Sequence, residues 1–147
     1  MIERNREGPA RCCSPPEALP SVLVLVGEPQ SAGHARAYAR DYLAHHAPTR
    51  SDDHVAEVAL VVCELVTNAI RYGTEPGDSL ALTLDVEDHR TRVEVRDPVR
   101  RRPRPRPESS ERDRGRGLVI LDAICPGAWG VHDVRFGKAV WAEVKAT

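Results

Sequence analysis

The sequence predicts an α+β two-layer sandwich, in which a mixed, mostly antiparallel sheet is covered on one face by about three helices. Short β-branched segments with alternating apolar residues indicate strands, and two longer segments with apolar residues at helical spacing indicate helices. The expected order is β-α-α-β-β-α-β-β, which lacks the regular alternation of a doubly wound parallel sheet. Short turns between consecutive strands favour antiparallel pairing.

Composition limits the class of protein. The chain has 147 residues, which fits one domain, and its 41% hydrophobic and 29% charged residues indicate a globular fold. The net charge of -1 offers no global attraction to nucleic acid or to an anionic membrane. No apolar run is long enough to cross a bilayer, and no cysteine pair has metal-ligand spacing. The four cysteines are Cys12, Cys13, Cys63 and Cys125, and a disulfide framework among them is not expected. These features predict a protein of the reducing cytoplasm.

The first third of the chain contains a tail, a strand and a helix. Residues 1–18 are rich in Arg, Glu, Pro and Gly without periodicity, which predicts a flexible tail ahead of a folded domain over residues 19–147. Residues 19–26 form a β-branched run that predicts a strand. Residues 31–46 carry apolar side chains at helical spacing, and Pro48 ends that helix.

A second helix is predicted between Ser51 or Asp52, either of which can cap it, and Gly73, which can end it. Its apolar face is formed by Val55, Val58, Val62, Leu65 and Ala69, and a second face by Glu57, Val61, Glu64, Asn68 and Arg71.

The remaining elements are two hairpins and a short helix. Alternation over residues 80–84 and 93–95, with a turn at 87–90, predicts the first hairpin. An apolar helix over 118–124 follows, and strands near 128–134 and 139–144, joined by a turn at 136–138, complete the sheet.

Glu64 and Asn68 are the most informative polar pair. They lie four residues apart in an otherwise apolar helix, so both side chains share one helical face. The amide oxygen of Asn68 can ligate Mg²⁺, and Glu64 can accept a proton from an attacking hydroxyl or water. The alternative is a solvated helix face that happens to carry both, and on the helix alone this alternative is favoured.

Two further places have the chemistry of a binding site. Asp97 closes a strand and can receive a ligand's exocyclic amine, or it initiates a turn before Pro98. A Gly-X-Gly start to the third helix lets backbone N–H groups approach a phosphate, or is simply a flexible loop. The residues of that start are Gly115, Arg116, Gly117 and Leu118.

The order of these blocks resembles the Bergerat ATP-binding fold of gyrase-type ATPases, Hsp90, MutL and histidine kinases. Within it, the chain resembles the actinobacterial variant of the anti-sigma-factor serine kinases, from about Leu19 to its end. The stretches that carry the resemblance are CELVTNAIRYG (63–73), VEVRDP (93–98), GRGLVILDAI (115–124), WGV (129–131) and GKAVWAEV (137–144).

The resemblance implies ATP and Mg²⁺ as cofactors and a role for each motif residue. Glu64 would be the general base, Asn68 the magnesium ligand, and Asp97 the partner of the adenine amino group. The segment 115–118 would line the phosphates. It implies transfer of the γ-phosphoryl group to a serine of an anti-anti-sigma (STAS-domain) partner, sequestration of a sigma factor, and commonly a homodimer, without direct binding of nucleic acid or membrane.

Two departures from the family pattern favour an alternative, a regulatory module that binds nucleotide without transferring phosphate. The glycines that usually follow the adenine aspartate are absent after Asp97. Ala139 stands where the family usually has a threonine whose hydroxyl helps to hold that aspartate or its water, and the loss of such a hydrogen bond typically costs about 0.5–1.5 kcal/mol.

The Arg/Pro-rich segment has three interpretations. Residues 98–114 predict a mobile ATP lid whose arginines meet phosphates. An electrostatic arm for an acidic partner or nucleic acid and a solvated linker are the alternatives. Specific single-strand binding is disfavoured because no aromatic residues are interleaved.

Overall fold

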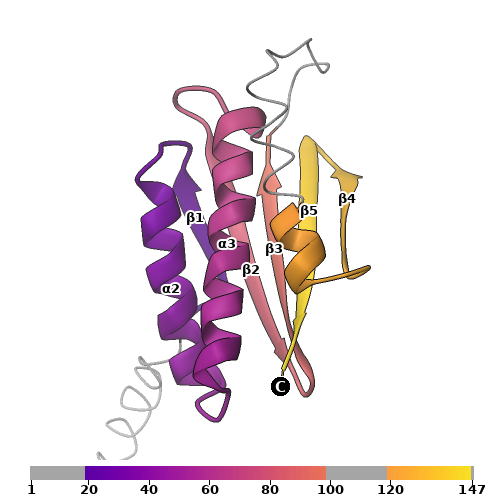
Figure 1. Ribbon diagram of the computed structural model, residues 1–147. Coiled ribbons are helices and arrows are strands. Elements are labelled where there is room, and N and C mark those ends of the chain that lie inside the picture. The colour runs from indigo at the N-terminus through magenta and orange to yellow at the C-terminus, as the bar shows by residue number, and fades with distance from the viewer. Residues whose placement is uncertain (1–18, 99–118, 147) are drawn as a thin grey trace, which may run out of the picture.

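The computed structural model describes residues 19–98 and 119–146, which form a helical layer packed on one face of a sheet (Figure 1). This two-layer α+β arrangement confirms the predicted fold class. The elements are β1 (Val22–Val26), α2 (Ser31–His46), α3 (Asp52–Gly73), β2 (Ser79–Glu87), β3 (Arg90–Asp97), a short helix over residues 119–124, β4 (Trp129–Val134) and β5 (Gly137–Lys145).

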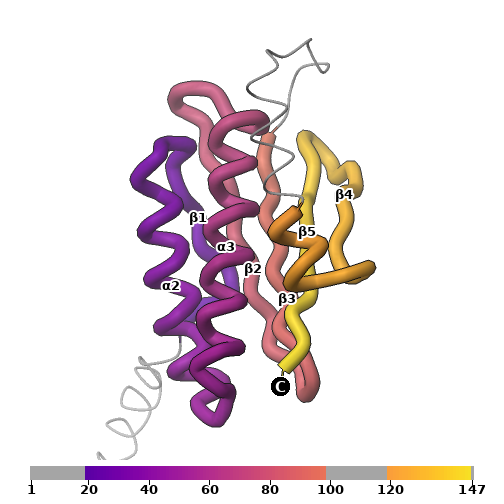
Figure 2. The backbone as a smooth tube through the Cα atoms, viewed as in Figure 1, coloured from indigo at the N-terminus to yellow at the C-terminus, as the bar shows by residue number. Residues whose placement is uncertain are grey.

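The five strands pair in the order β1-β2-β3-β5-β4, and every pair among the described strands is antiparallel. The last strand, β5, lies between β3 and β4, as the path of the backbone shows (Figure 2). This insertion brings the start of β5 next to the end of β3. Asp97 of β3 therefore pairs with Lys138 of β5, and Lys138 pairs in turn with Asp133 of β4.

Element boundaries differ from the expected ones at two strands. The first strand begins at Val22 rather than at residue 19, since Pro20 has no N–H to give to the ladder. The last strand begins at Gly137, because the turn lies at Arg135 and Phe136 instead of at residues 136–138. The expected tail (1–18), most of the expected lid (98–114) and residue 118 lie outside the described residues.

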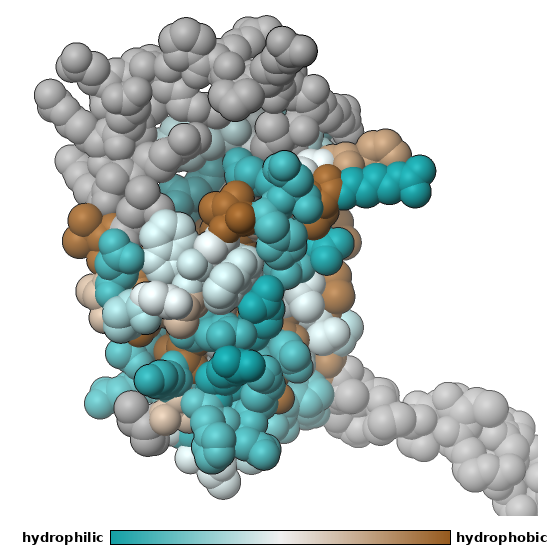
Figure 3. Space-filling model, turned by 90° about the vertical axis from the view of Figure 1, so that its right-hand side faces the viewer, coloured by the Kyte–Doolittle hydropathy of each residue, from teal (hydrophilic) through white to brown (hydrophobic). Residues whose placement is uncertain are grey.

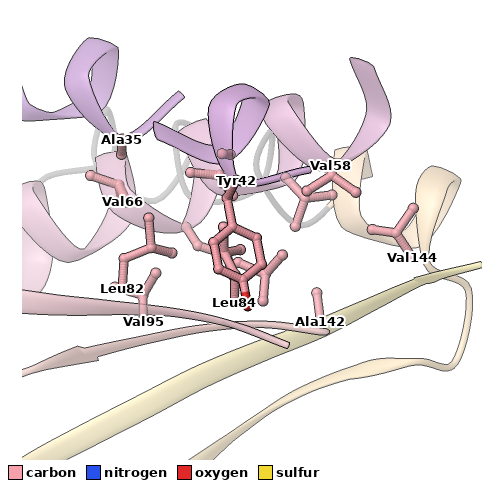
Figure 4. Close-up of a cluster of buried hydrophobic side chains, with 14 of the residues drawn as sticks. Ala35, Tyr42, Val58, Val66, Leu82, Leu84, Val95, Ala142 and Val144 are labelled. Carbon is pink, nitrogen blue, oxygen red and sulfur yellow. The ribbon is translucent and has the colours of Figure 1, made fainter. Parts of the chain in front are cut away.

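The core between the two layers is built from aliphatic side chains, as the low aromatic content requires (Figure 4). Leu82, Leu84 and Val95 project from the sheet and are fully buried. Val58 and Val66 meet them from α3, and Tyr42 contributes a ring from α2 (Figure 4). Leu→Ala changes in such cores typically cost about 2–5 kcal/mol, so this interface holds the helical layer on the sheet.

The N-terminus of α3 is fixed by its cap. The Ser51 hydroxyl accepts a hydrogen bond from the His54 N–H at 3.1 Å, and Asp52 and Asp53 place negative charge in the first turn. Ser51, and not Asp52, is therefore the N-cap of this helix. Within the parts of the chain that the structure describes, no helix is both long and apolar enough to cross a membrane.

The β4 side of the molecule is mainly hydrophilic, with separate hydrophobic patches (Figure 3). β4 is an edge strand, and its His132 and Asp133, together with Arg135 in the following turn, are exposed. Charged side chains on an edge strand oppose pairing with other chains. The exposed large apolar side chains of this region are Val119, Val131 and Phe136.

His54 is a fully buried polar residue that ties α3 to the sheet. Its Nδ1 lies 3.0 Å from the Lys145 carbonyl oxygen, and its Nε2 lies 2.8 Å from the Thr91 hydroxyl. The ring must donate from Nδ1, since a carbonyl only accepts, so Thr91 donates to Nε2 in the neutral tautomer. Burial is the largest effect and lowers the pKa of His54. The hydrogen bond to the Lys145 carbonyl and the Glu57 charge raise this pKa and the Arg50 charge lowers it, so that the net shift is downward.

We expect stability to fall in mild acid because of His54. A depressed folded-state pKa means that the unfolded chain binds the proton more readily, so stabilisation is present above about pH 6.5 and is lost as the pH drops below it. Chemical denaturation from pH 7 to 5 should show this loss, at most about 1.4 kcal/mol per pH unit. His54→Gln should flatten the slope, and His34→Gln, on the exposed face of α2, should keep it. A steep slope retained by His54→Gln would assign the effect elsewhere.

Candidate functional site

One flank of α3 carries the polar residues singled out in the sequence. Glu57, Glu64 and Asn68 are half-buried, while Val61, one turn from both glutamates, is fully buried. A flank that buries a valine completely is packed against other parts of the protein. Glu64 and Asn68 are nevertheless partly exposed and Arg71 of the same flank is exposed, so both the site and the alternative of a solvated face stay predictions.

The helix over residues 119–124 lies beside α3 and above β3 and β5 (Figures 1 and 2). Its Leu121 and the following Cys125 are buried in the common core. Burial raises the pKa of the Cys125 thiol to about 11, with additional effects of the Glu57 and Glu143 carboxylates. Figures 1 and 2 show this helix next to α3. The expected phosphate-binding residues Gly115, Arg116, Gly117 and Leu118 directly precede it and lie outside the described residues.

Asp97 is buried at the end of β3, with 4% of its surface exposed. Its carboxylate lies against the last residue of α3, Gly73, where a Cβ would overlap it and come within 2.6 Å of Oδ1. Any other residue at position 73 would displace the carboxylate. The glycine that ends the helix therefore also forms the seat of this acid.

The opposite side of Asp97 is formed by β5. A Cβ at Gly137 would overlap the Asp97 carbonyl oxygen, so the backbones approach closely there. The Lys138 ammonium lies 3.5 Å from Asp97 Oδ2. Asp97 is thus held between the end of α3 and the start of β5.

The structure pairs residue 139 with Arg96 and not with Asp97. Asp97 pairs directly with Lys138, and successive side chains of a strand point to opposite faces of the sheet. Ala139 pairs with Arg96 and is fully buried on the face away from the Asp97 carboxylate. A hydroxyl at position 139 would therefore lie on the opposite face of the sheet from that carboxylate, and a contact with it through water stays a prediction.

The positions along α3 relate the three predicted residues. Asn68 precedes Gly73 by five residues, which corresponds to about 7.5 Å along the helix axis and about 140° around it. Glu64 lies about 6 Å before Asn68, further from Gly73. Asp97 therefore meets the end of α3 at Gly73, while Glu64 and Asn68 lie earlier on the same helix. That all three contact one ligand stays a prediction.

The family of histidine kinase-like ATPase domains matches residues 25–126 of the chain. The chain belongs to this family. The matched segment contains Glu64, Asn68, Asp97 and residues 115–118, so every site residue predicted from the sequence falls within the ATPase domain, while Lys138 lies beyond the match.

A solved structure with the same fold is that of the RsbU and RsbW domains of Rv1364c from Mycobacterium tuberculosis. It superposes on this ATPase-family domain with a TM-score of 0.59 and 19% sequence identity, over 87% of this chain. The domain covers 33% of that longer chain. No curated protein matched this sequence.

Sequence reasoning missed two residues beside Asp97. Gly73 was expected only to end the helix, and Lys138 was expected only to lie in a turn. The seat that Gly73 provides depends on how α3 packs on β3, which no local pattern contains. The Lys138 contact requires the register of β3 on β5, strands that are 40 residues apart. A Gly-Lys pair at the start of the last strand was the available signal.

Proposed function

We propose that this domain binds Mg²⁺-ATP, transfers the γ-phosphoryl group to a serine of an anti-anti-sigma (STAS-domain) partner and sequesters a sigma factor, in the cytoplasm. The observation that carries the proposal is the buried Asp97, seated against Gly73 at the end of the helix that bears Glu64 and Asn68. Membership of the ATPase-domain family supports nucleotide binding. The likeness to a structure that includes an RsbW domain supports the anti-sigma assignment.

The residues present fit the nucleotide and its metal ion. The missing side chain of Gly73 leaves space for a carboxylate that accepts a hydrogen bond from the exocyclic amine of adenine. Asn68 and Glu64 offer the oxygen donors that Mg²⁺ prefers. The described residues contain no cluster of three His, Cys, Asp or Glu side chains suited to a metal. The ion would therefore rely on Asn68 together with phosphate oxygens and water, as is usual for magnesium–nucleotide sites.

The chain's own residues would position the reactants and accept a proton. When bound, Mg²⁺-ATP supplies the transferable phosphoryl group and neutralises its charge. Asp97 fixes the purine end, and Asn68 orients the phosphate end through its amide oxygen. Glu64 would accept the proton that the partner's serine hydroxyl loses when the γ-phosphoryl group passes to its oxygen, with ADP as the leaving group. General-base catalysis of this kind contributes about 10²–10⁴-fold in rate.

The test is phosphotransfer from γ-labelled ATP to candidate STAS-domain proteins in the presence of Mg²⁺. We expect label on a serine of one partner, which mass spectrometry will locate. Binding of Mg²⁺-ATP without label on any of the partners would contradict the kinase assignment, and would leave the sigma-binding assignment to a separate pull-down with purified sigma factors.

The alternative is a catalytically weak or inactive module that binds nucleotide and regulates by protein–protein contact alone. The absence of glycine directly after Asp97 favours it, since Pro98 restricts the backbone there. Calorimetry that shows Mg²⁺-ATP binding, with no turnover on any partner, would support this module. Robust phosphotransfer would exclude it.

A further inference from the structure

We propose that Lys138 is a positioning residue for the purine end of the site, which holds the Asp97 carboxylate in place to accept the exocyclic amine of adenine. This inference rests on the proposed nucleotide binding. It assigns a function to a lysine at the position that faces Asp97 across β3 and β5, at 3.5 Å from Oδ2.

Strand register places Lys138 in a row of charges. Asp97 of β3, Lys138 of β5 and Asp133 of β4 are consecutive cross-strand partners, so their side chains lie on the same face of the sheet. The two acids differ in burial, because Asp97 is buried and Asp133 is exposed. The ammonium forms its ion pair with the buried acid rather than with the exposed one.

The burial of the pair explains why a cation is needed there. The Asp97 side chain is 1% exposed, whereas that of Lys138 is 26% exposed, so the lysine reaches a buried acid from the surface. A buried carboxylate is costly unless a charge compensates it. Arg96, the neighbouring cation on β3, points to the opposite face and pairs with Glu94 at 2.9 Å. Lys138 is therefore the cation that the sheet directs to Asp97.

The lysine and an adenine amine can bind the same acid together. A carboxylate has about four acceptor positions on its two oxygens, so one ammonium at Oδ2 does not exhaust it. Gly73 leaves little room for the carboxylate to rotate. Without the ammonium, the carboxylate loses one of the charges that hold it, and even a small displacement of Oδ2 within this tight space moves its oxygen relative to the purine. Loss of Lys138 should therefore weaken purine binding.

The experiment compares Mg²⁺-ATP and adenosine binding to the wild type, Lys138→Met and Lys138→Arg by calorimetry and by NMR shift titration. We expect Lys138→Met to weaken the binding of both ligands about tenfold. This is roughly the effect of losing one charge-assisted hydrogen bond, here the one between Asp97 and the adenine amine. Lys138→Arg should restore most of the affinity. The kcat at saturating ATP should be unchanged, because Lys138 acts on binding at the purine end and not on phosphoryl transfer.

Controls separate this role from a structural one. Asp133→Asn removes the exposed carboxylate beside the same lysine and should leave both affinities unchanged. Removal of one partner of a buried ion pair destabilises a protein, so the thermal midpoint of Lys138→Met should fall, and binding is compared at a temperature at which both proteins are fully folded. Unchanged adenosine binding in Lys138→Met, or a loss confined to Mg²⁺-ATP, would overturn the inference and indicate no role or a phosphate contact. A wild type that binds neither ligand would instead overturn the proposed function itself.

Discussion

Glu64→Gln should slow phosphotransfer to the STAS partner by about 10²–10⁴-fold while Mg²⁺-ATP affinity stays within about threefold of the wild type. The substitution keeps the shape and the half-buried position of the side chain but removes the proton acceptor. A base that acts only in the chemical step lowers kcat and leaves ground-state binding unchanged. Single-turnover phosphotransfer at saturating ATP measures the effect.

Glu57→Gln is the matched control for this variant. Glu57 lies two turns earlier on the same flank of α3 and is also half-buried, but it is further from Asp97. It should transfer phosphate at the wild-type rate. Equal rates for Glu64→Gln and the wild type would show that Glu64 is not the base, and equal losses in both glutamine variants would indicate a general effect on the flank.

Gly73→Ala should abolish most nucleotide binding, with a loss of affinity greater than about tenfold. The new Cβ would overlap the Asp97 carboxylate, which is confined by the Lys138 ammonium on its other side. Overpacking of this kind also costs about 1–3 kcal/mol of stability. Calorimetric titration with Mg²⁺-ATP and denaturant unfolding measure the two effects separately.

Gly33→Ala provides the comparison, since nothing lies within 4 Å of a Cβ at that exposed position in α2. It should stabilise the protein by about 0.5–1 kcal/mol, as alanine does in place of glycine within helices, and should leave nucleotide binding unchanged. Wild-type affinity in Gly73→Ala would mean that the seat of Asp97 is not part of a binding site.

The helices were the most predictable elements because local signals mark both of their ends. The apolar spacing and Pro48 gave the observed range of α2, Ser31–His46, and Ser51 and Gly73 marked the two ends of α3. The strand ends were less predictable, since they depend on pairing partners. Val22, not residue 19, begins β1 because pairing with Thr83 of β2 starts there.

Only part of the candidate site could be predicted, because several of its contacts join elements that are distant in sequence. The four-residue spacing of Glu64 and Asn68 is local, and so is the position of Asp97 at the end of a strand. The contacts of Asp97 with Gly73 and Lys138 arise from packing between elements that are distant in sequence. The alternation of β5 then decides that residue 138, and not residue 139, faces the acid.

The most direct test of a shared site is calorimetric titration of the wild type, Asn68→Ala and Asp97→Asn with Mg²⁺-ATP and with adenosine. Both variants should bind Mg²⁺-ATP at least about tenfold more weakly than the wild type. Adenosine binding should weaken in Asp97→Asn alone, because only this residue contacts the purine. Wild-type affinity for Mg²⁺-ATP in either variant would contradict a single nucleotide site that joins the flank of α3 to the end of β3.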